Sequence, residues 1–250
     1  MLNAGRIIEE LVAVCHRVDA KGFVAAADGN ISARLPNGNI LITPSSLNKG
    51  FVMPDDLVEI SLHGERVAGK ATPSSEKAMH LFIYKHRPDV NAVVHCHPVY
   101  ATAFAAARIP LSERLFPEVI IGLGAVPLAR YATPSTEEVG ESIAPYVNSA
   151  DAVLLTNHGV VTYGNDLWDA YFKMEKVEQM AQIEFAARAL GGAKELSSDE
   201  VSRLLRIAES SYRRNASAVA AVTPSREIEI TEEEFHAIVE EVKKRLHQSA

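Results

Sequence analysis

The stretch that decides the fold of this chain reads Ala71-Thr-Pro-Ser-Ser-Glu-Lys77 and, further on, Asn91-Ala-Val-Val-His-Cys-His-Pro98. The first piece predicts the start of a helix that one of its two serines caps. The second predicts a short buried strand, which the proline ends. Alternate residues of a strand share a face, so His95 and His97 can point at the same place while the cysteine between them faces the other way.

A third histidine follows another apolar run, in Thr156-Asn157-His158-Gly159. With His95, His97 and the carboxylate of Glu76, it would give a ligand set that suits a divalent ion such as Zn²⁺. Three neutral imidazoles leave an open coordination position, which is typical of catalytic rather than structural zinc. Unrelated core histidines are the alternative. Two at strand spacing and a third at another strand end are less often accidental.

Turns rich in glycine, asparagine and serine lie upstream of the histidines, in Asp28-Gly29-Asn30 and in Thr43-Pro44-Ser45-Ser46. Glycine and asparagine permit positive φ and close backbone approach, and clustered hydroxyl and N–H groups can hold an anion. Ordinary turn and cap chemistry explains each motif taken alone. Their agreement with Ser74-Ser75, at a predicted helix start, favours a phosphate site.

Helical and strand patterns alternate along the rest of the chain. Helical spacing occurs at about residues 6–21, 74–86, 101–107, 136–146, 167–190 and 198–212. Short strands are predicted at about 30–35, 40–43, 57–61, around Val67, and at 90–95, 125–128, 151–156 and 160–163. This alternation predicts an α/β domain, and the Pro36-Asn37-Gly38-Asn39 hairpin makes part of its sheet antiparallel. An amphipathic helix at 231–247 reads as a C-terminal appendage.

Net charge, cysteine content and the lack of long apolar runs indicate what this protein binds. A formal charge of −7 argues against nucleic acid, because phosphate contacts need a basic face. Cys15 and Cys96 make no disulfide framework, so reduced thiols are expected. Neither a signal peptide nor a bilayer-spanning run is found. We therefore expect a cytoplasmic protein that acts on a small molecule and binds neither nucleic acid nor membrane.

Together these motifs resemble the class II aldolase/adducin family, most closely its sugar-phosphate aldolases of the L-fuculose-1-phosphate aldolase type. The resemblance covers about residues 6–212. It rests on Gly29-Asn30-Ile31-Ser32, Thr43-Pro44-Ser45-Ser46, Pro73-Ser74-Ser75-Glu76, His95-Cys96-His97-Pro98, Tyr131-Ala132-Thr133 and Asn157-His158-Gly159.

The resemblance implies a single three-layer α/β/α domain with a largely antiparallel central sheet. We assign this catalytic domain to residues 1–215 and a C-terminal loop and helix extension to 216–250. The resemblance also implies a homotetramer with sites between subunits. Each subunit would hold one Zn²⁺ on His95, His97 and His158, with Glu76 as a fourth ligand or as a base displaced from the metal. The implied phosphate pocket consists of Gly29, Asn30, Ser45, Ser46, Ser74 and Ser75.

The activity so implied is reversible cleavage of a ketose 1-phosphate, of fuculose or deoxyribulose type, into dihydroxyacetone phosphate and an aldehyde. Glu76 would move the proton, and no catalytic lysine is needed. Two tyrosines of the family need counterparts. Phe116 aligns with one that a neighbouring subunit donates, and a phenyl ring transfers no proton, which makes nearby Glu118 a candidate. Tyr212 aligns with the other, near the C-terminus.

Three alternatives remain. A pentulose-phosphate 4-epimerase would use an aspartate within residues 111–130, and none occurs there. A methylthioribulose-1-phosphate dehydratase would use the same metal, with Glu118 as acid or base. An adducin-like assembly protein is the non-enzyme alternative, and a scaffold would have no need of the three histidines and Glu76.

Overall fold

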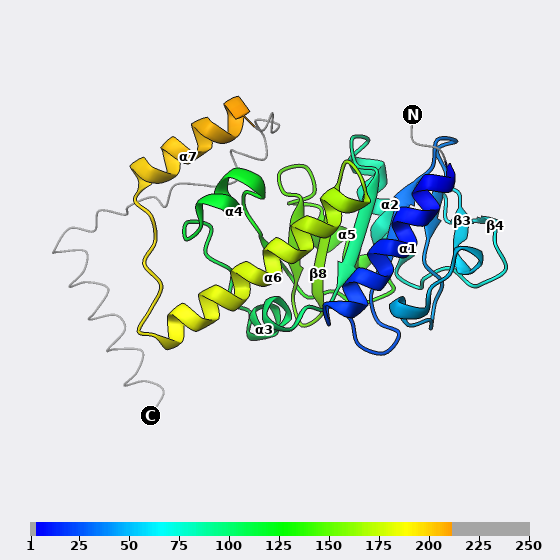
Figure 1. The fold of residues 1–250 in the computed structure, drawn as a ribbon, viewed down its shortest axis with the longest axis horizontal. Helices are drawn as coiled ribbons and strands as arrows, with labels where there is room; N and C mark the ends of the chain where they lie inside the picture. The colour runs from blue at the N-terminus through cyan, green and yellow to red at the C-terminus, as the bar shows by residue number, and fades with distance from the viewer. Residues whose placement is uncertain (1–3, 212–250) are drawn as a thin grey trace, which may run out of the picture.

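One eight-stranded sheet runs through the described part of the molecule, in the strand order β4-β3-β2-β1-β5-β8-β7-β6 (Figure 1). The structure is a computed structural model, and it describes residues 4–211. All neighbouring strands are antiparallel except β6 and β7, which are parallel. The strands are β1 (Asn30–Arg34), β2 (Ile40–Ile42), β3 (Val58–Ile60), β4 (Arg66–Ala68), β5 (Ala92–Cys96), β6 (Leu128–Ala129), β7 (Ala152–Leu155) and β8 (Gly159–Gly164).

Helices cover both faces of this sheet. Those packed on it are α1 (Ala4–Ala20), α2 (Lys77–His86), α3 (Val99–Ala107), α5 (Glu138–Ile143) and α6 (Leu167–Ala189). Apolar residues of α1, α3 and α6 form one buried cluster with one face of the strands, and those of α2 and α5 form a second cluster with the other. The predicted three-layer α/β/α domain with a largely antiparallel sheet is confirmed.

Alternation along β5 explains how one strand serves both layers. Val94 and Cys96 belong to the cluster under α1 and α6, whereas Val93 belongs to the cluster under α2. His95 shares the side of Val93 because side chains alternate across a strand. His95, the first of the paired histidines, therefore lies on the face of the sheet that α2 covers. Cys96 is buried on the opposite face, as expected.

Two further helices, α4 (Pro117–Gly122) and α7 (Ser198–Ser211), contact one another, and Val119 of α4 also belongs to the cluster that α1, α3 and α6 form (Figure 1). They enclose a small third cluster that contains Ile120, Ala125 and Val201. The sequence pattern indicated α7 but showed no period for α4. Short 3₁₀ turns occur at Lys49–Phe51 and Pro54–Asp56. The predicted domain boundary at 215, the helix at 231–247 and Tyr212 lie outside the described residues.

The start of α2 corrects one expectation. Glu76 occupies the N-cap position, and no side chain caps the helix there. The hydroxyl of Ser74 instead accepts a hydrogen bond from the N–H of Glu76, at 3.3 Å. The serines therefore belong to the turn before the helix, which leaves them beside the site described below.

Candidate metal and anion site

Three histidines meet at one edge of the sheet. His95 lies on β5, His97 follows that strand, and His158 lies in the turn between β7 and β8. Their ligand nitrogens lie within 4.8 Å of one another, and the Nε2 atoms of His95 and His97 are 3.2 Å apart. The three imidazoles predicted from the sequence therefore converge.

Close passage of two backbones makes this convergence possible. A Cβ added at Gly159 would lie 2.5 Å from Cδ2 of His97 and 2.6 Å from the carbonyl oxygen of Cys96. Only glycine lets β8 start this close to the end of β5. Asn157, just before His158, adopts φ 56°, a conformation that asparagine tolerates better than most residues.

His95 is held in one orientation by the neighbouring strand. Its Nδ1 lies 2.9 Å from the carbonyl oxygen of Val160, which can only accept, so Nδ1 carries the proton. When the ring is neutral, the lone pair of Nε2 then faces the other two rings. A backbone carbonyl that orients the ring in this way is a common feature around metal-binding histidines.

Glu76 faces the same centre. Its Oε2 lies 3.3 Å from Nε2 of His95, and its Oε1 lies 3.2 Å from Nε2 of His158. Asn30 donates a hydrogen bond to Oε2 at 2.8 Å, whereas Oε1 is buried and makes no hydrogen bond. An orphaned carboxylate oxygen beside imidazole nitrogens is costly unless a cation satisfies it. The donors present therefore fit a divalent ion such as Zn²⁺.

The charges in this cluster are strongly coupled. Burial alone would raise the pKa of Glu76, but His95 and His158 outweigh it and hold that pKa well below its usual range. Burial, reinforced by the charges of His95 and His158, lowers the pKa of His97 to about 3. Burial also acts to lower the pKa of His95, yet the Glu76 carboxylate raises it overall. Glu76 is thus ionised and His97 neutral, which are the forms that bind a metal.

A cavity of about 260 Å³ opens beside the histidines. Four serine-rich or glycine-rich turns line it together with Glu76, His97 and His158. All six residues predicted to hold phosphate are among the lining residues: Gly29, Asn30, Ser45, Ser46, Ser74 and Ser75.

Backbone contacts tie two of these turns together. The N–H of Ser45 donates to the carbonyl of Thr72, and the N–H of Ser74 donates to the carbonyl of Thr43. The hydroxyl of Ser45 donates to the carbonyl of Pro73 at 3.0 Å. No lysine or arginine occurs among the described residues that line the cavity. An anion there would be held by hydroxyl and N–H groups rather than by side-chain cations.

Sequence reasoning missed Ser135 and Asp28. Ser135 lines the cavity and donates a hydrogen bond to the hydroxyl of Ser75 at 2.9 Å. A signal was present, because Thr133-Pro134-Ser135 repeats the Thr-Pro-Ser sequence of the other two loops. Asp28 also lines the cavity, with Oδ2 3.7 Å from Nδ1 of His97. Nothing in its sequence context distinguishes it from an ordinary turn residue.

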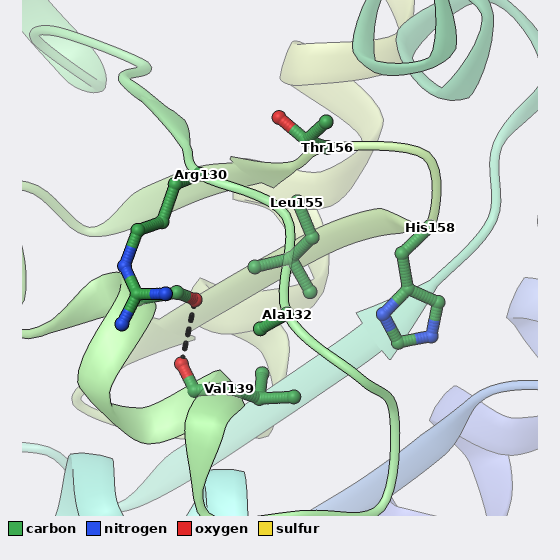
Figure 2. Close-up of a pocket in the computed structure, with 7 residues that line it drawn as sticks. Arg130, Ala132, Val139, Leu155, Thr156 and His158 are labelled. Atoms are coloured by element: carbon green, nitrogen blue, oxygen red, sulfur yellow. Dashed lines mark hydrogen bonds between the residues drawn. The ribbon is translucent and has the colours of Figure 1, made fainter.

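His158 also borders a second, much smaller cavity of about 10 Å³ (Figure 2). Figure 2 shows Arg130 and the His158 ring at opposite ends of it, with Leu155 and Ala132 between them. The volume suits at most about one water molecule. The larger cavity is therefore the one with room for a substrate.

Two other candidate residues are not brought to the site. Phe116 packs against the main core next to α4, and Glu118 is exposed in the first turn of that helix. Neither is among the residues lining the cavity. Tyr212 lies outside the described residues.

This chain is similar in sequence to proteins of a known family. The family described as Class II Aldolase and Adducin N-terminal domain matches residues 9–185. An L-fuculose phosphate aldolase of Methanococcus maripaludis is 36% identical over 174 residues, covering 70% of this chain and 93% of that protein. A 3-oxo-tetronate 4-phosphate decarboxylase of Escherichia coli is 32% identical over 181 residues, covering 71% and 85%.

A solved structure shares the fold of this chain. An L-fuculose 1-phosphate aldolase superposes with a TM-score of 0.75 at 30% identity, covering 82% of this chain and 96% of that one. No helix among residues 4–211 combines the length and apolar character that crossing a membrane requires.

Proposed function

Because the chain belongs to the class II aldolase and adducin family, we propose that it is a zinc-dependent aldolase. Its substrate would be a ketose 1-phosphate of fuculose or deoxyribulose type, cleaved reversibly into dihydroxyacetone phosphate and an aldehyde. The observation that carries this proposal is the unsatisfied Oε1 of Glu76, which faces His158 beside a hydroxyl-lined cavity.

His95, His97 and His158 would hold the metal, with Glu76 as a fourth ligand or displaced when substrate binds. When bound there, Zn²⁺ supplies Lewis acidity that polarises the C2 carbonyl of the ketose. The protein contributes the orientation of the donors, which the Val160 carbonyl sets for His95.

Glu76 is the group that moves a proton. In cleavage it accepts the proton of the C4 hydroxyl, the electron pair of that O–H bond forms the aldehyde C=O, and the C3–C4 bond breaks. The pair from the broken bond stays on the C3 side, next to the C2 carbonyl, until an acid protonates C3. In condensation Glu76 removes a proton from the hydroxymethyl carbon of dihydroxyacetone phosphate. A carboxylate ionised at neutral pH is ready for both directions.

The serine-lined cavity would bind the phosphate ester. Hydroxyl and N–H groups of four turns can surround its oxygens without a side-chain cation. Anchoring the phosphate places C2 and C3 beside Glu76, and such positioning accelerates the chemical step.

Condensation also needs a proton donor for the aldehyde oxygen. Phe116 cannot supply a proton, and we propose Tyr212 for this role. We further propose a cytoplasmic homotetramer with sites between subunits. Its solution mass should then be four times the 27.2 kDa of the chain.

Decarboxylation is a second candidate, favoured by the relative from Escherichia coli. Loss of CO₂ from a 3-oxo acid also leaves an electron pair next to a carbonyl, so the same cavity could serve it. The two reactions differ in whether an aldehyde or CO₂ leaves.

Proton exchange provides the deciding experiment. The zinc-loaded protein is incubated in D₂O with dihydroxyacetone phosphate alone, and loss of one hydroxymethyl proton signal is followed by NMR. An aldolase exchanges that proton, and added aldehydes then yield ketose 1-phosphates. A fully loaded protein that neither exchanges the proton nor forms a new product with any aldehyde would overturn the proposal. Release of CO₂ from a 3-oxo acid phosphate, without formation of a ketose from any aldehyde, would favour the second candidate whether or not the proton exchanges.

A further inference from the structure

Behind Glu76 lies a chain of hydrogen bonds that the proposed reaction does not use. Asn30 Nδ2 contacts Glu76 Oε2 at 2.8 Å, and Asn30 Oδ1 contacts His80 Nε2 at 2.5 Å. The other ring nitrogen, Nδ1 of His80, lies 2.7 Å from the hydroxyl of Ser32, which lies 2.9 Å from the hydroxyl of Tyr84. His80 and Ser32 are fully buried, and Asn30 and Tyr84 nearly so.

The direction of each hydrogen bond in this chain follows from the Asn30 contact with Glu76 and from the neutral state of the His80 ring. The amide N–H of Asn30 donates to Glu76 Oε2, and Asn30 Oδ1, which can only accept, faces His80. Nε2 of His80 must then carry the proton. Burial, together with the charge of His95, lowers the pKa of His80 to about 3, so the ring is neutral and its Nδ1 accepts from Ser32. The Tyr84 O–H in turn donates to Ser32, and all donors point towards Glu76.

Helix and strand periods build this chain. Glu76, the N-cap of α2, is followed at intervals of four residues by His80 and Tyr84, so the three lie on one side of the helix. Asn30 and Ser32 are alternate residues of β1, so they lie on one face of the sheet. The register pairs Asn30 with His95 on β5, which sets its carboxamide beside the histidine cluster.

We infer that His80 is a positioning residue for the site. Its Nε2–H holds the Asn30 carboxamide in one orientation, and that carboxamide holds Glu76 with Oε1 directed at His158. Without the His80 donor, the carboxamide is free to rotate and can turn its oxygen, rather than its N–H, towards Glu76 Oε2. Two acceptors would then face one another, and Glu76 would leave the centre. The inference rests on the proposed metal site.

A double-mutant cycle read out by metal binding tests this inference. The probe is Co²⁺ alone, with affinity measured by chelator competition and ligand geometry followed by visible absorption. His80→Leu removes the donor, and we expect it to weaken Co²⁺ binding by roughly 10- to 100-fold, as for other residues that orient metal ligands. Asn30→Ala should do the same. The double variant should bind no more weakly than Asn30→Ala, because His80 acts only through Asn30.

Two further variants separate positioning from packing. His80→Gln keeps an N–H donor and should restore affinity to within a few-fold of the wild type. His86→Gln is the matched control on the same helix, where the ring contacts the carbonyl of Phe82, and it should change nothing. Should His80→Leu fail to fold, Ser32→Ala replaces it. That variant removes the hydroxyl that bonds His80 Nδ1, and it should weaken Co²⁺ in the wild-type background but not in Asn30→Ala.

The outcomes distinguish the inference from its premise. Wild-type protein that binds no Co²⁺ at all would overturn the metal site, and this inference with it. Wild-type protein that binds Co²⁺ while His80→Leu binds equally well would overturn only the inference. So would a loss that is as large in the Asn30→Ala background as in the wild type.

Discussion

Gly159 passes His97 so closely that a β-carbon on it would stand 2.5 Å from Cδ2 of that ring. No real β-carbon tolerates such a contact, so Gly159→Ala must displace either the histidine or the start of β8. We expect at least a 10-fold loss of zinc affinity and a loss of unfolding free energy of about 1–3 kcal/mol, which is usual for overpacking. Metal titration and urea denaturation measure these two effects.

Gly122→Ala on α4 is the matched control for this substitution. Its added β-carbon would meet the end of the flexible Lys176 side chain, which can move aside. Zinc affinity should be unchanged. Equal losses in the two variants would mean that glycine replacement itself, rather than the contact with His97, explains the result.

Glu76→Gln separates proton transfer from metal binding. The amide keeps the shape of the carboxylate but cannot accept a proton, and three histidines remain to hold the ion. In excess zinc, we expect zinc content and thermal stability to stay near those of the wild type, although zinc affinity falls as it does when Glu76 is turned away, while turnover falls by roughly 10²- to 10⁴-fold. His95→Ala should instead lower the zinc content itself. Full turnover in Glu76→Gln would exclude the assigned role.

Ser135→Ala tests the third Thr-Pro-Ser loop as part of the phosphate site. A hydrogen bond to a charged group contributes about 1.5–3 kcal/mol, so KM should rise roughly 10- to 100-fold with little change in kcat. Ser149→Ala is a suitable control, because that hydroxyl bonds only the Tyr146 carbonyl in the described structure. An unchanged KM for the phosphorylated substrate would remove Ser135 from the site.

The spacing of residues along the sequence predicted much of this site. The remaining contacts depend on packing between segments that are far apart in the sequence. His95 and His97 could be paired from strand alternation alone, and glycine at 159 agrees with the tight turn beside them. Ser135 reaches Ser75 only because residues 133–135 fold back over a loop sixty positions away, a contact that no local period encodes. The same limit applies to His80. The helical pattern predicts only its place on a helix, and its contacts with Asn30 and Ser32 arise from the packing of β1 against α2.

Acid should destabilise the metal-free protein partly through His80. Burial, with the charge of His95, lowers its pKa to about 3 from a model-compound value of 6.5. Between these values the unfolded chain binds a proton that the folded chain does not, so the free energy of unfolding falls as pH falls. One such proton contributes about 1.4 kcal/mol per pH unit, or about 2 kcal/mol between neutral pH and pH 5.

Urea denaturation of the wild type and of His80→Gln at neutral pH and at pH 5 measures this contribution of His80. His97 and the other titrating groups are common to the two proteins and cancel in the difference. The wild type should lose about 2 kcal/mol more than the variant, and equal losses would show that His80 is not buried as a neutral ring.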